Sequence, residues 1–341
     1  MPHEEQSYQE AVLVLPRMRV QNANAVSSPM TWGFPSITAF IGLMHALARR
    51  LPTDCGLEFR GVGVICHDHE AQVTEGGYTR AFRLSRNPVD KDGSTAAIVE
   101  EGRIHLDITL VFLVNLTGQE QTDSARQQLA QLALDTVAEM RIAGGSVFPA
   151  MQAGTRRQQR PLLQELPDTP TDQKDAFRRM SRRWLPGFAL VARDDLLQSH
   201  LTTLQQTDAD STALDAWLDL SRLNHRVVRS PGTDSKTGEA TETVEWITER
   251  PKGWTVPIPV GYAALSALHA AGTVANARDM TTPFRFVESV YSVGQWVSPH
   301  RLADLNDLLW YSKVDEPTGL YRCCNDYANA PSSTAHPALI D

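Results

Sequence analysis

Residues 11–20 read AVLVLPRMRV, an apolar run that changes toward its end to alternating apolar and basic residues. A continuous apolar run is typical of a strand covered on both faces, and alternation is typical of one with a single buried face. After the polar residues 21–35, Ser36 precedes ITAFIGLMHALARR, where apolar residues recur every three or four positions. The pattern predicts a central strand followed by a helix, with Ser36 as the N-cap.

The elements that follow continue this strand–helix pattern. Apolar runs predict further strands at 60–73, 103–114 and 184–192, and an amphipathic pattern predicts a helix at 123–141. The turn at 143–146, which reads AGGS, is expected to end that helix, because glycine accepts the left-handed conformation after a C-cap. The order βαββαβ is that of the ferredoxin-like or RRM-type arrangement, so we predict an α+β fold.

Two regions divide the chain. Residues 11–193 are expected to form an RRM-like palm, with a thumb insertion at about residues 74–102, where no regular pattern persists and a functional excursion is typical. Residues 194–341 are expected to form a C-terminal mixed extension, helical and irregular, that packs on the palm. Helices are expected at 194–206, 212–223 and 300–311, and polar loops at 151–175 and 230–242.

The charge is unevenly distributed. A net charge of −8 is unusual for a protein that binds nucleic acid. However, residues 141–193 contain ten basic and four acidic residues, whereas residues 194–249 contain four basic and eleven acidic ones. This asymmetry suits one face for a polyanion and another for solvent or protein. Arginine, which binds phosphates and stacks on bases, supplies 27 of the 32 basic residues, although a GC-rich genome would also raise its count.

Several features predict a reduced, cytoplasmic protein with no membrane partner. No apolar run approaches the roughly 20 residues that cross a bilayer, and the polar, acidic N-terminus is unlike a secretory signal. The four cysteines contain no CxxC pair, so a structural zinc site is not expected. Within CHDHE at 66–70, strand alternation would place His67 and His69 on one side and the other three residues on the opposite side. We therefore assign neither a metal nor a cofactor.

Four groups of residues could contact RNA. The uncharged loop at 21–28 suits base edges, although Asn and Ser also make turns by bonding their own backbone, and Trp32 either stacks a base or packs. Basic residues spaced by three in the thumb, and the run RRMSRR at 178–183, suit phosphates, although a solvated helix face has the same pattern. Bare backbone after Arg141 could approach a phosphate or simply cap a helix. The candidates are Asn22, Asn24, Ser27, Ser28, Trp32, His67, Arg80, Arg83, Arg86, Arg141, Gly144, Gly145, Arg178, Arg179, Arg182 and Arg183.

Long strings along the chain resemble one family. They are LPRMRVQNANAVSSPMTWGFPSITAFIGLMHAL, SRNPVDKDGSTAAIVEEGR, MRIAGGSVFP, RRWLPGFALV, GWTVPIPVGYAALS, NARDMTTPFRFVES and SPHRLADLNDLLWY. These strings are similar to the crRNA 5′-handle-binding subunit of the type I-F CRISPR (Csy) surveillance complex, a member of the RAMP group. The resemblance runs from about residue 11 to 321 and fails over 152–175, over 230–242 and in the C-terminal tail.

The resemblance implies a scaffolding role in antiviral defence. Such a subunit holds the crRNA 5′ handle, pairs with the large subunit, touches the backbone subunit and meets target DNA only through the assembled complex. Guide cleavage belongs to a separate endoribonuclease, and no nucleophile elbow or phosphate-binding loop occurs here, so we expect no catalytic residues. Two alternatives remain. One is a guide-processing endoribonuclease of the RAMP group, in which His67, His69 and Tyr78 could be proposed as the catalytic base and proton donor, although no spacing selects them. The other is an adaptor that does not touch RNA.

Overall fold

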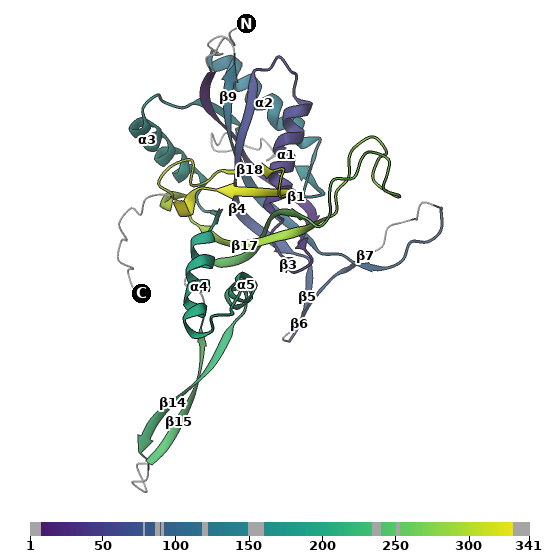
Figure 1. The fold of residues 1–341 in the computed structure, drawn as a ribbon. Coiled ribbons are helices and arrows are strands. Elements are labelled where there is room, and N and C mark those ends of the chain that lie inside the picture. The colour runs from purple at the N-terminus through teal and green to yellow at the C-terminus, as the bar shows by residue number, and fades with distance from the viewer. Residues whose placement is uncertain are drawn as a thin grey trace.

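One large antiparallel sheet organises the protein. The computed structural model describes residues 8–77, 79–85, 89, 92–117, 122–148, 160–233, 240–249 and 253–329. The strand order along the sheet is β10-β11-β1-β9-β4-β13-β17-β16-β19-β18, and β12 also pairs with β1 (Figure 1). The fold is therefore mixed α+β, as the sequence predicts. No helix in the described part of the chain is both long and apolar enough to cross a membrane.

The expected strands and helices of the N-terminal half are confirmed. They are β1 (Tyr8–Asn24), α1 (Ile37–Arg50), β4 (Leu57–Ala71), β9 (Arg103–Thr117) and α2 (Asp123–Ala138). The long β1 and β4 both pair with β9, antiparallel. The Ser36 hydroxyl accepts a hydrogen bond from the Thr38 backbone N–H at 3.3 Å, which confirms the N-cap of α1.

Both faces of the central sheet are buried, which explains the continuous apolar run in β1. On one face Leu13 and Leu15 pack in a cluster with apolar residues of α1 and α2, among them Phe40. On the other face Val12 and Val14 pack in a second cluster. That cluster includes side chains of α3 (Pro170–Ser181), of the 3₁₀ turn η2 (Arg182–Trp184) and of residues 302–309.

The strand expected at 184–192 has a different partner from the one a ferredoxin-like order requires. It is the shorter β13 (Phe188–Ala192), which pairs with β4 and with β17 (Val287–Val297) rather than with β1. Three other short strands lie along β1, directly or through a neighbour. They are β10 (Arg141–Ile142), β11 (Gly145–Phe148) and β12 (Leu162–Glu165).

The helix expected to end at residues 143–146 ends earlier, at Ala138. Ala143 and Gly144 have φ values of 48° and 80° and form the two-residue turn between β10 and β11. Two consecutive residues with positive φ are characteristic of a type I′ hairpin turn, whose twist matches the flanking strands. The glycines therefore make a hairpin and not a helix cap.

The C-terminal region adds four more strands to the same sheet. They are β16 (Thr255–Ala264), β17, β18 (Trp310–Asp315) and β19 (Leu320–Asn325), and a last 3₁₀ turn, η4 (Tyr327–Asn329), follows. The prediction of a helix at 300–311 is wrong, since only the short η3 (Pro299–Arg301) forms there. Asp307 accepts hydrogen bonds from the backbone N–H groups of Ala303 (2.7 Å) and Asp304 (3.4 Å). Such local bonds compete with helix formation.

The helices expected at 194–206 and 212–223 are confirmed as α4 (Asp194–Thr207) and α5 (Ala213–Ser221). The predictions of polar loops at 151–175 and 230–242 are both wrong in part, because each segment contains regular structure. Residues 230–242 include the paired ends of a long hairpin, β14 (Asn224–Thr233) and β15 (Ala240–Glu249). Residues 151–175 include β12 and the start of α3, while residues 151–159 lie outside the described part.

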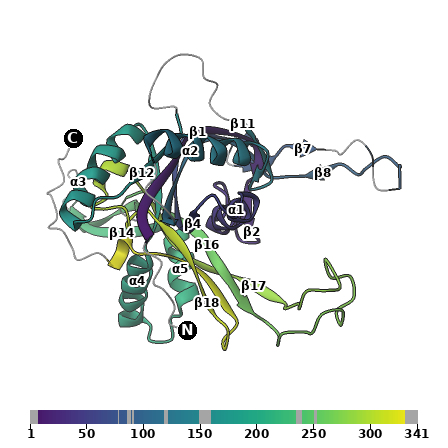
Figure 2. The same cartoon turned by 90° about the horizontal axis from the view of Figure 1, so that it is seen from above.

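Two hairpins extend from the thumb region, and a third lies before α1. The first two are β5 (Val73–Gly76) with β6 (Thr79–Phe82), and β7 (Leu84–Ser85) with β8 (Val99–Glu100). The third is β2 (Val26–Ser28) with β3 (Thr31–Trp32). In both ribbon views β7 and β8 project on the side opposite α3 (Figures 1 and 2).

Two buried polar side chains attach the C-terminal strands to β13. The Asn325 amide accepts from Ala192 N–H at 2.9 Å and donates to the carbonyls of Asp307 (2.8 Å) and Leu309 (2.9 Å). The indole N–H of the fully buried Trp310 donates to the Leu190 carbonyl at 2.8 Å. Because buried polar groups need partners, these bonds fix the position of the last two strands.

We predict that Asn325→Asp lowers the free energy of unfolding by about 3 kcal/mol at neutral pH. The carboxylate cannot donate to the two buried carbonyls, which then lack their partner. Urea denaturation followed by intrinsic fluorescence measures the loss. Asn306→Asp, at an exposed position in the neighbouring loop, is the control and should change the stability by less than about 0.5 kcal/mol. Equal stability of the two variants would contradict this role for Asn325.

Candidate nucleic-acid interface

A groove of about 480 Å³ lies between the N-terminal and C-terminal parts of the large sheet. One wall is the segment 32–37 that leads into α1, and the other is the segment 254–259 at the start of β16. Ile104, Leu190 and Trp296 also line it. We call this space the aromatic groove. Residues far apart in the sequence therefore form one site.

Aromatic rings dominate this groove. Trp32 is 47% exposed, Trp254 is 49% exposed and Phe188 is 42% exposed. Further in, Trp296 lies edge-on to Phe34, with ring centroids 4.8 Å apart. Large apolar side chains gathered at a concave surface indicate a binding site, because leaving them in contact with water is unfavourable.

The chain places Trp254 by a glycine and a backbone hydrogen bond. Gly253 has φ 83°, a conformation that favours glycine, and a Cβ there would lie 2.3 Å from the Gln295 amide nitrogen. The Trp254 carbonyl accepts from the Trp296 N–H at 3.0 Å. The backbone that carries Trp254 is thereby fixed on β17.

Four of the predicted RNA-binding residues line the aromatic groove: Ser27, Trp32, His67 and Arg80. Arg80 lies on β6 and forms an exposed ion pair with Glu75 across the hairpin, at 2.9 Å. The Ser27 hydroxyl lies 2.7 Å from the Thr31 hydroxyl. The structure thus brings a cation of the thumb and residues of the 21–35 segment to one place.

A bulge in β4 changes the expected alternation at residues 66–70. The pairing with β9 shifts between Cys66 and Asp68, so that Cys66 faces the same side of the sheet as His69. His67 uses both ring nitrogens, with Nδ1 2.7 Å from the Pro186 carbonyl and Nε2 2.7 Å from the Thr109 hydroxyl. Burial lowers the pKa of His67, so the ring is held neutral.

The segment predicted as a loop at 21–28 consists of the end of β1 and of β2. Its Asn24 lies beside the turn at 143–146, and Asn22 and Asn24 do not line the groove, whereas Ser27 does. The Asn24 N–H donates to the Ala143 carbonyl at 2.8 Å, and the Asn24 side chain bonds both backbone groups of Val26. The Asn22 N–H donates to Nδ1 of His105 at 3.1 Å. Turn-making, the alternative reading of this loop, therefore accounts for the hydrogen bonds of Asn24.

Other predicted residues in this region have structural contacts too. Arg141 donates to the Gly144 carbonyl at 3.2 Å. A Cβ on Gly145 would lie 2.7 Å from a Val20 methyl carbon, so glycine is needed for close packing on β1. The Ser28 hydroxyl lies 2.7 Å from the Thr31 hydroxyl, so its hydrogen bond is within the β2–β3 hairpin.

The arginines of α3 and η2 form a separate basic surface. Its arginines Arg178, Arg179, Arg182 and Arg183 are exposed, whereas the large apolar side chains of the same stretch are buried: Phe177, Met180 and Trp184. Arg178 forms an ion pair with Asp175 at 3.1 Å. This helix lies on the opposite side of the molecule from the thumb hairpins (Figures 1 and 2), so the structure does not bring these arginines to the groove. In the thumb, Arg83 donates to the Gln72 amide at 2.7 Å, and Arg86 and Tyr78 lie outside the described residues.

Sequence reasoning missed most of the aromatic residues of the groove. Phe34, Phe188, Trp254 and Trp296 were not among the candidates, because nothing in the local pattern shows that they meet. One signal was present: Gly253-Trp254 mirrors Trp32-Gly33, a tryptophan beside a glycine in a turn. Glycine with positive φ beside each ring is the shared local feature.

The groove is suited to stacking more than to reaction. Burial raises the pKa of the Cys66 thiol to about 12, so it is not a thiolate at neutral pH. Among the residues that the structure describes, no group of three or more His, Cys, Asp or Glu is arranged to hold a metal ion. Flat rings and a guanidinium are groups that bind bases and phosphates.

Comparison with known proteins identifies the family. The family described as CRISPR-associated protein (Cas_Csy2) matches residues 13–323, which include both walls of the groove. The CRISPR-associated protein Csy2 of Pseudomonas aeruginosa (strain UCBPP-PA14) is 47% identical over 315 residues, covering 92% of this chain and 94% of that protein. The chain therefore belongs to the Csy2 family of CRISPR-associated proteins.

Proposed function

We propose that this protein is the subunit of a type I-F (Csy) surveillance complex that holds the 5′ handle of the guide RNA. In this role it cuts nothing. It pairs with the large subunit, touches the backbone subunit, and fixes one end of the guide in the assembly. Membership of the Csy2 family supports the assignment to a CRISPR complex, and the aromatic groove supports the contact with RNA.

One observation carries the RNA contact: half-exposed tryptophans from two distant parts of the chain line one groove that Arg80 also lines. Single-stranded RNA is recognised by stacking unpaired bases on aromatic rings, with cations along the backbone. A groove built this way also suits an acidic protein. The net charge of −8 repels RNA at long range, so local contacts must supply the affinity.

The sheet supports a palm of the RAMP type. The order β11-β1-β9-β4, with α1 and α2 packed on the same face, is the order in which a ferredoxin-like βαββαβ unit arranges its strands. The opposite face, which an RRM uses to stack bases, is covered here by α3 and residues 302–309. RNA would therefore bind at the groove beside the thumb hairpins and not across the open sheet.

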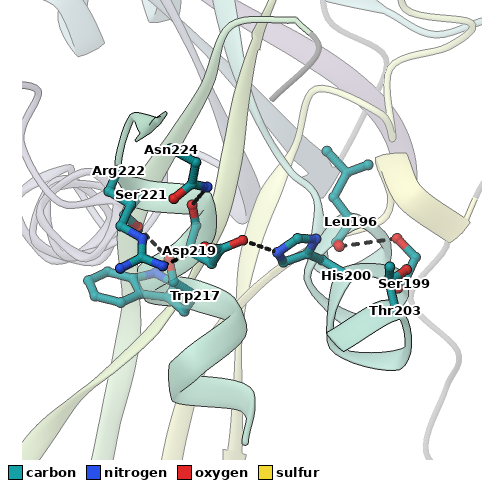
Figure 3. A network of polar contacts seen from close by, with 9 residues as sticks. All are labelled: Leu196, Ser199, His200, Thr203, Trp217, Asp219, Ser221, Arg222 and Asn224. Atoms are coloured by element: carbon teal, nitrogen blue, oxygen red, sulfur yellow. Dashed lines mark hydrogen bonds and ion pairs between the residues drawn. The ribbon is translucent and has the colours of Figure 1, made fainter. Parts of the chain in front are cut away.

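The acidic region after residue 193 is a candidate surface for protein partners. The Asp219 carboxylate accepts from His200 (2.7 Å) on α4 and from Arg222 (2.8 Å), and the Asn224 amide donates to the Asp219 carbonyl at 3.1 Å (Figure 3). This network joins α4, α5 and the start of β14. In the hairpin that follows, Trp246 is 69% exposed. An isolated two-stranded hairpin is at best marginally stable in water, and a large exposed apolar side chain on it marks a surface for a partner. We propose that a neighbouring subunit covers it.

The endoribonuclease alternative has less support. Cleavage at a 2′-hydroxyl needs a free base and a proton donor close to it. Both ring nitrogens of His67 are already bonded to Pro186 and Thr109, so this histidine is not free to accept a proton from RNA. The His69 ring is unbonded within the described residues, but cleavage needs a second group beside it, and Tyr78 lies outside the described residues.

We predict that the pure protein leaves repeat RNA intact, with or without divalent metal ions. Denaturing gel electrophoresis of end-labelled repeat RNA after incubation measures this. His67→Ala is the informative control, because a specific cut made by the wild-type protein and lost in this variant would establish catalysis. Non-specific degradation that both proteins share would identify a contaminant.

We predict that Arg80→Ala weakens binding of handle RNA and reduces its salt dependence. Each phosphate contact to a single strand contributes about 0.7 log units of affinity per log unit of salt, so the slope should fall by about that amount. The matched control is Arg229→Ala, since Arg229 is also exposed and also forms an ion pair across a hairpin, with Glu242 at 3.2 Å. A salt series of filter-binding titrations measures both. Equal slopes for the two variants would remove Arg80 from the interface.

We predict that replacing Arg178, Arg179, Arg182 and Arg183 together with Ala also weakens guide retention and flattens the salt slope. Four exposed guanidinium groups on α3 and the adjoining η2 suit a second stretch of phosphates. The same salt series measures the effect in the chain co-purified with the large subunit. Wild-type affinity and slope in this variant would show that α3 is only a solvated surface.

A further inference from the structure

We infer that the aromatic groove holds one unstacked nucleobase of the RNA, between Trp32 on one wall and Trp254 on the other. The inference rests on the proposed function and deepens it. It assigns to this space a ligand class, a single flipped-out base with its phosphate, and it assigns the recognition to two particular rings.

Each of the two rings packs against other aromatic rings, so its orientation is fixed before a ligand arrives. The Trp32 ring meets the edge of Phe82, on the β6 strand of the thumb, with centroids 5.5 Å apart. The Trp254 ring lies 5.2 Å from Phe188 and 6.1 Å from Trp296. Rings held in place lose little freedom when a base stacks on them, which favours tight binding. About half of each tryptophan is nevertheless exposed and available for contact.

The size of the groove suits one base and not a helix. A volume of about 480 Å³ lies in the range of small-molecule sites, which is roughly 300–1,000 Å³. The two walls come from segments that pack on each other, since β16 lies against β2 and β3. A double helix has no access to such a space, whereas a base turned out of a single strand has.

Polar groups beside the rings match the rest of a nucleotide. His69 pairs with Leu106, whose side chain is in the cluster on the α1 face, so the His69 side chain faces the groove. Its ring makes no hydrogen bond within the described part of the chain and is free to bond a base edge. Arg80 also lines the groove, and a phosphate can replace the exposed carboxylate of Glu75 as its partner.

An apolar side chain of a partner protein is the other occupant to consider. Flat, half-exposed rings beside a guanidinium and an unbonded imidazole fit a base better, since an apolar side chain would leave the His69 ring without a hydrogen bond and would offer nothing to Arg80.

A 2-aminopurine scan tests the inference. The full chain is co-purified with the large subunit, and synthetic copies of the 5′ segment of its guide carry 2-aminopurine at one position at a time. Binding to the wild-type protein should quench one position far more than its neighbours. Trp32→Ala and Trp254→Ala should each restore most of that fluorescence and weaken binding roughly 5- to 150-fold, the range for loss of one stacked base.

Matched variants separate stacking from damage to the fold. Trp254→Phe keeps an aromatic face and should keep most of the quenching. Phe286→Ala removes a half-exposed aromatic side chain that does not line the groove, and should leave both the quenched position and the affinity unchanged. Thermal unfolding of each variant should match the wild type, because both groove tryptophans are half exposed.

The outcomes distinguish this inference from the proposed function. If the wild-type protein binds the RNA but no quenched position depends on Trp32 or Trp254, the base site is overturned while handle binding stands. If the wild-type protein binds no RNA, both are overturned. If the alanine variants keep RNA affinity but lose a protein subunit from the complex, the groove takes a protein side chain and the inference is wrong.

Discussion

The groove depends on the two-sided pairing of one five-residue strand. Strand β13 forms backbone hydrogen bonds to β4 on one edge and to β17 on the other, and so joins the N-terminal half of the sheet to its C-terminal half. Asn325 and Trp310 reinforce the junction by bonding to Ala192 and Leu190 of this strand. The wall that carries Trp32 belongs to the first half and the wall that carries Trp254 to the second. Strand β13 thus fixes the walls relative to each other, together with the packing of β16 on β2 and β3 and the pairing of β18 with β4.

A compact centre with projecting extensions suits a subunit that connects other molecules. The central sheet is covered on both faces by apolar clusters, whereas the hairpins β7–β8 and β14–β15 extend away from it in different directions (Figures 1 and 2). Extensions of this kind cannot bury much of their own apolar surface and gain stability from whatever they contact. The acidic surface around α4 and α5 and the basic surface of α3 lie on separate elements. The charge pattern therefore allows RNA and protein partners to bind at the same time.

The sequence predicts the local elements well and the long-range contacts poorly, for a physical reason. Helix α1 begins at its predicted cap and ends at Arg50, because apolar spacing and capping are local properties. By contrast, the partner of β13 is decided by strands β4 and β17, which are more than 90 residues away in either direction along the chain, and no local pattern contains that information. Turn chemistry explains another difference, since Ala143-Gly144 suits a hairpin turn as well as a helix cap. The candidate site shows the same difference between local and long-range information. Trp32 and Arg80 were predicted from the residues next to them in the sequence, whereas Trp254 becomes a candidate only because the folded sheet places it at the same groove.

The central claim is that this chain holds guide RNA at the aromatic groove. Ultraviolet crosslinking of the intact complex, followed by mass spectrometry of the RNA-linked peptides, tests it directly without any substitution. The account predicts crosslinked peptides that contain Trp32 or Trp254, together with peptides of the thumb near Arg80, all attached to the 5′ segment of the guide. Crosslinks confined to α3 or to the β14–β15 hairpin, or none to this subunit, would contradict it.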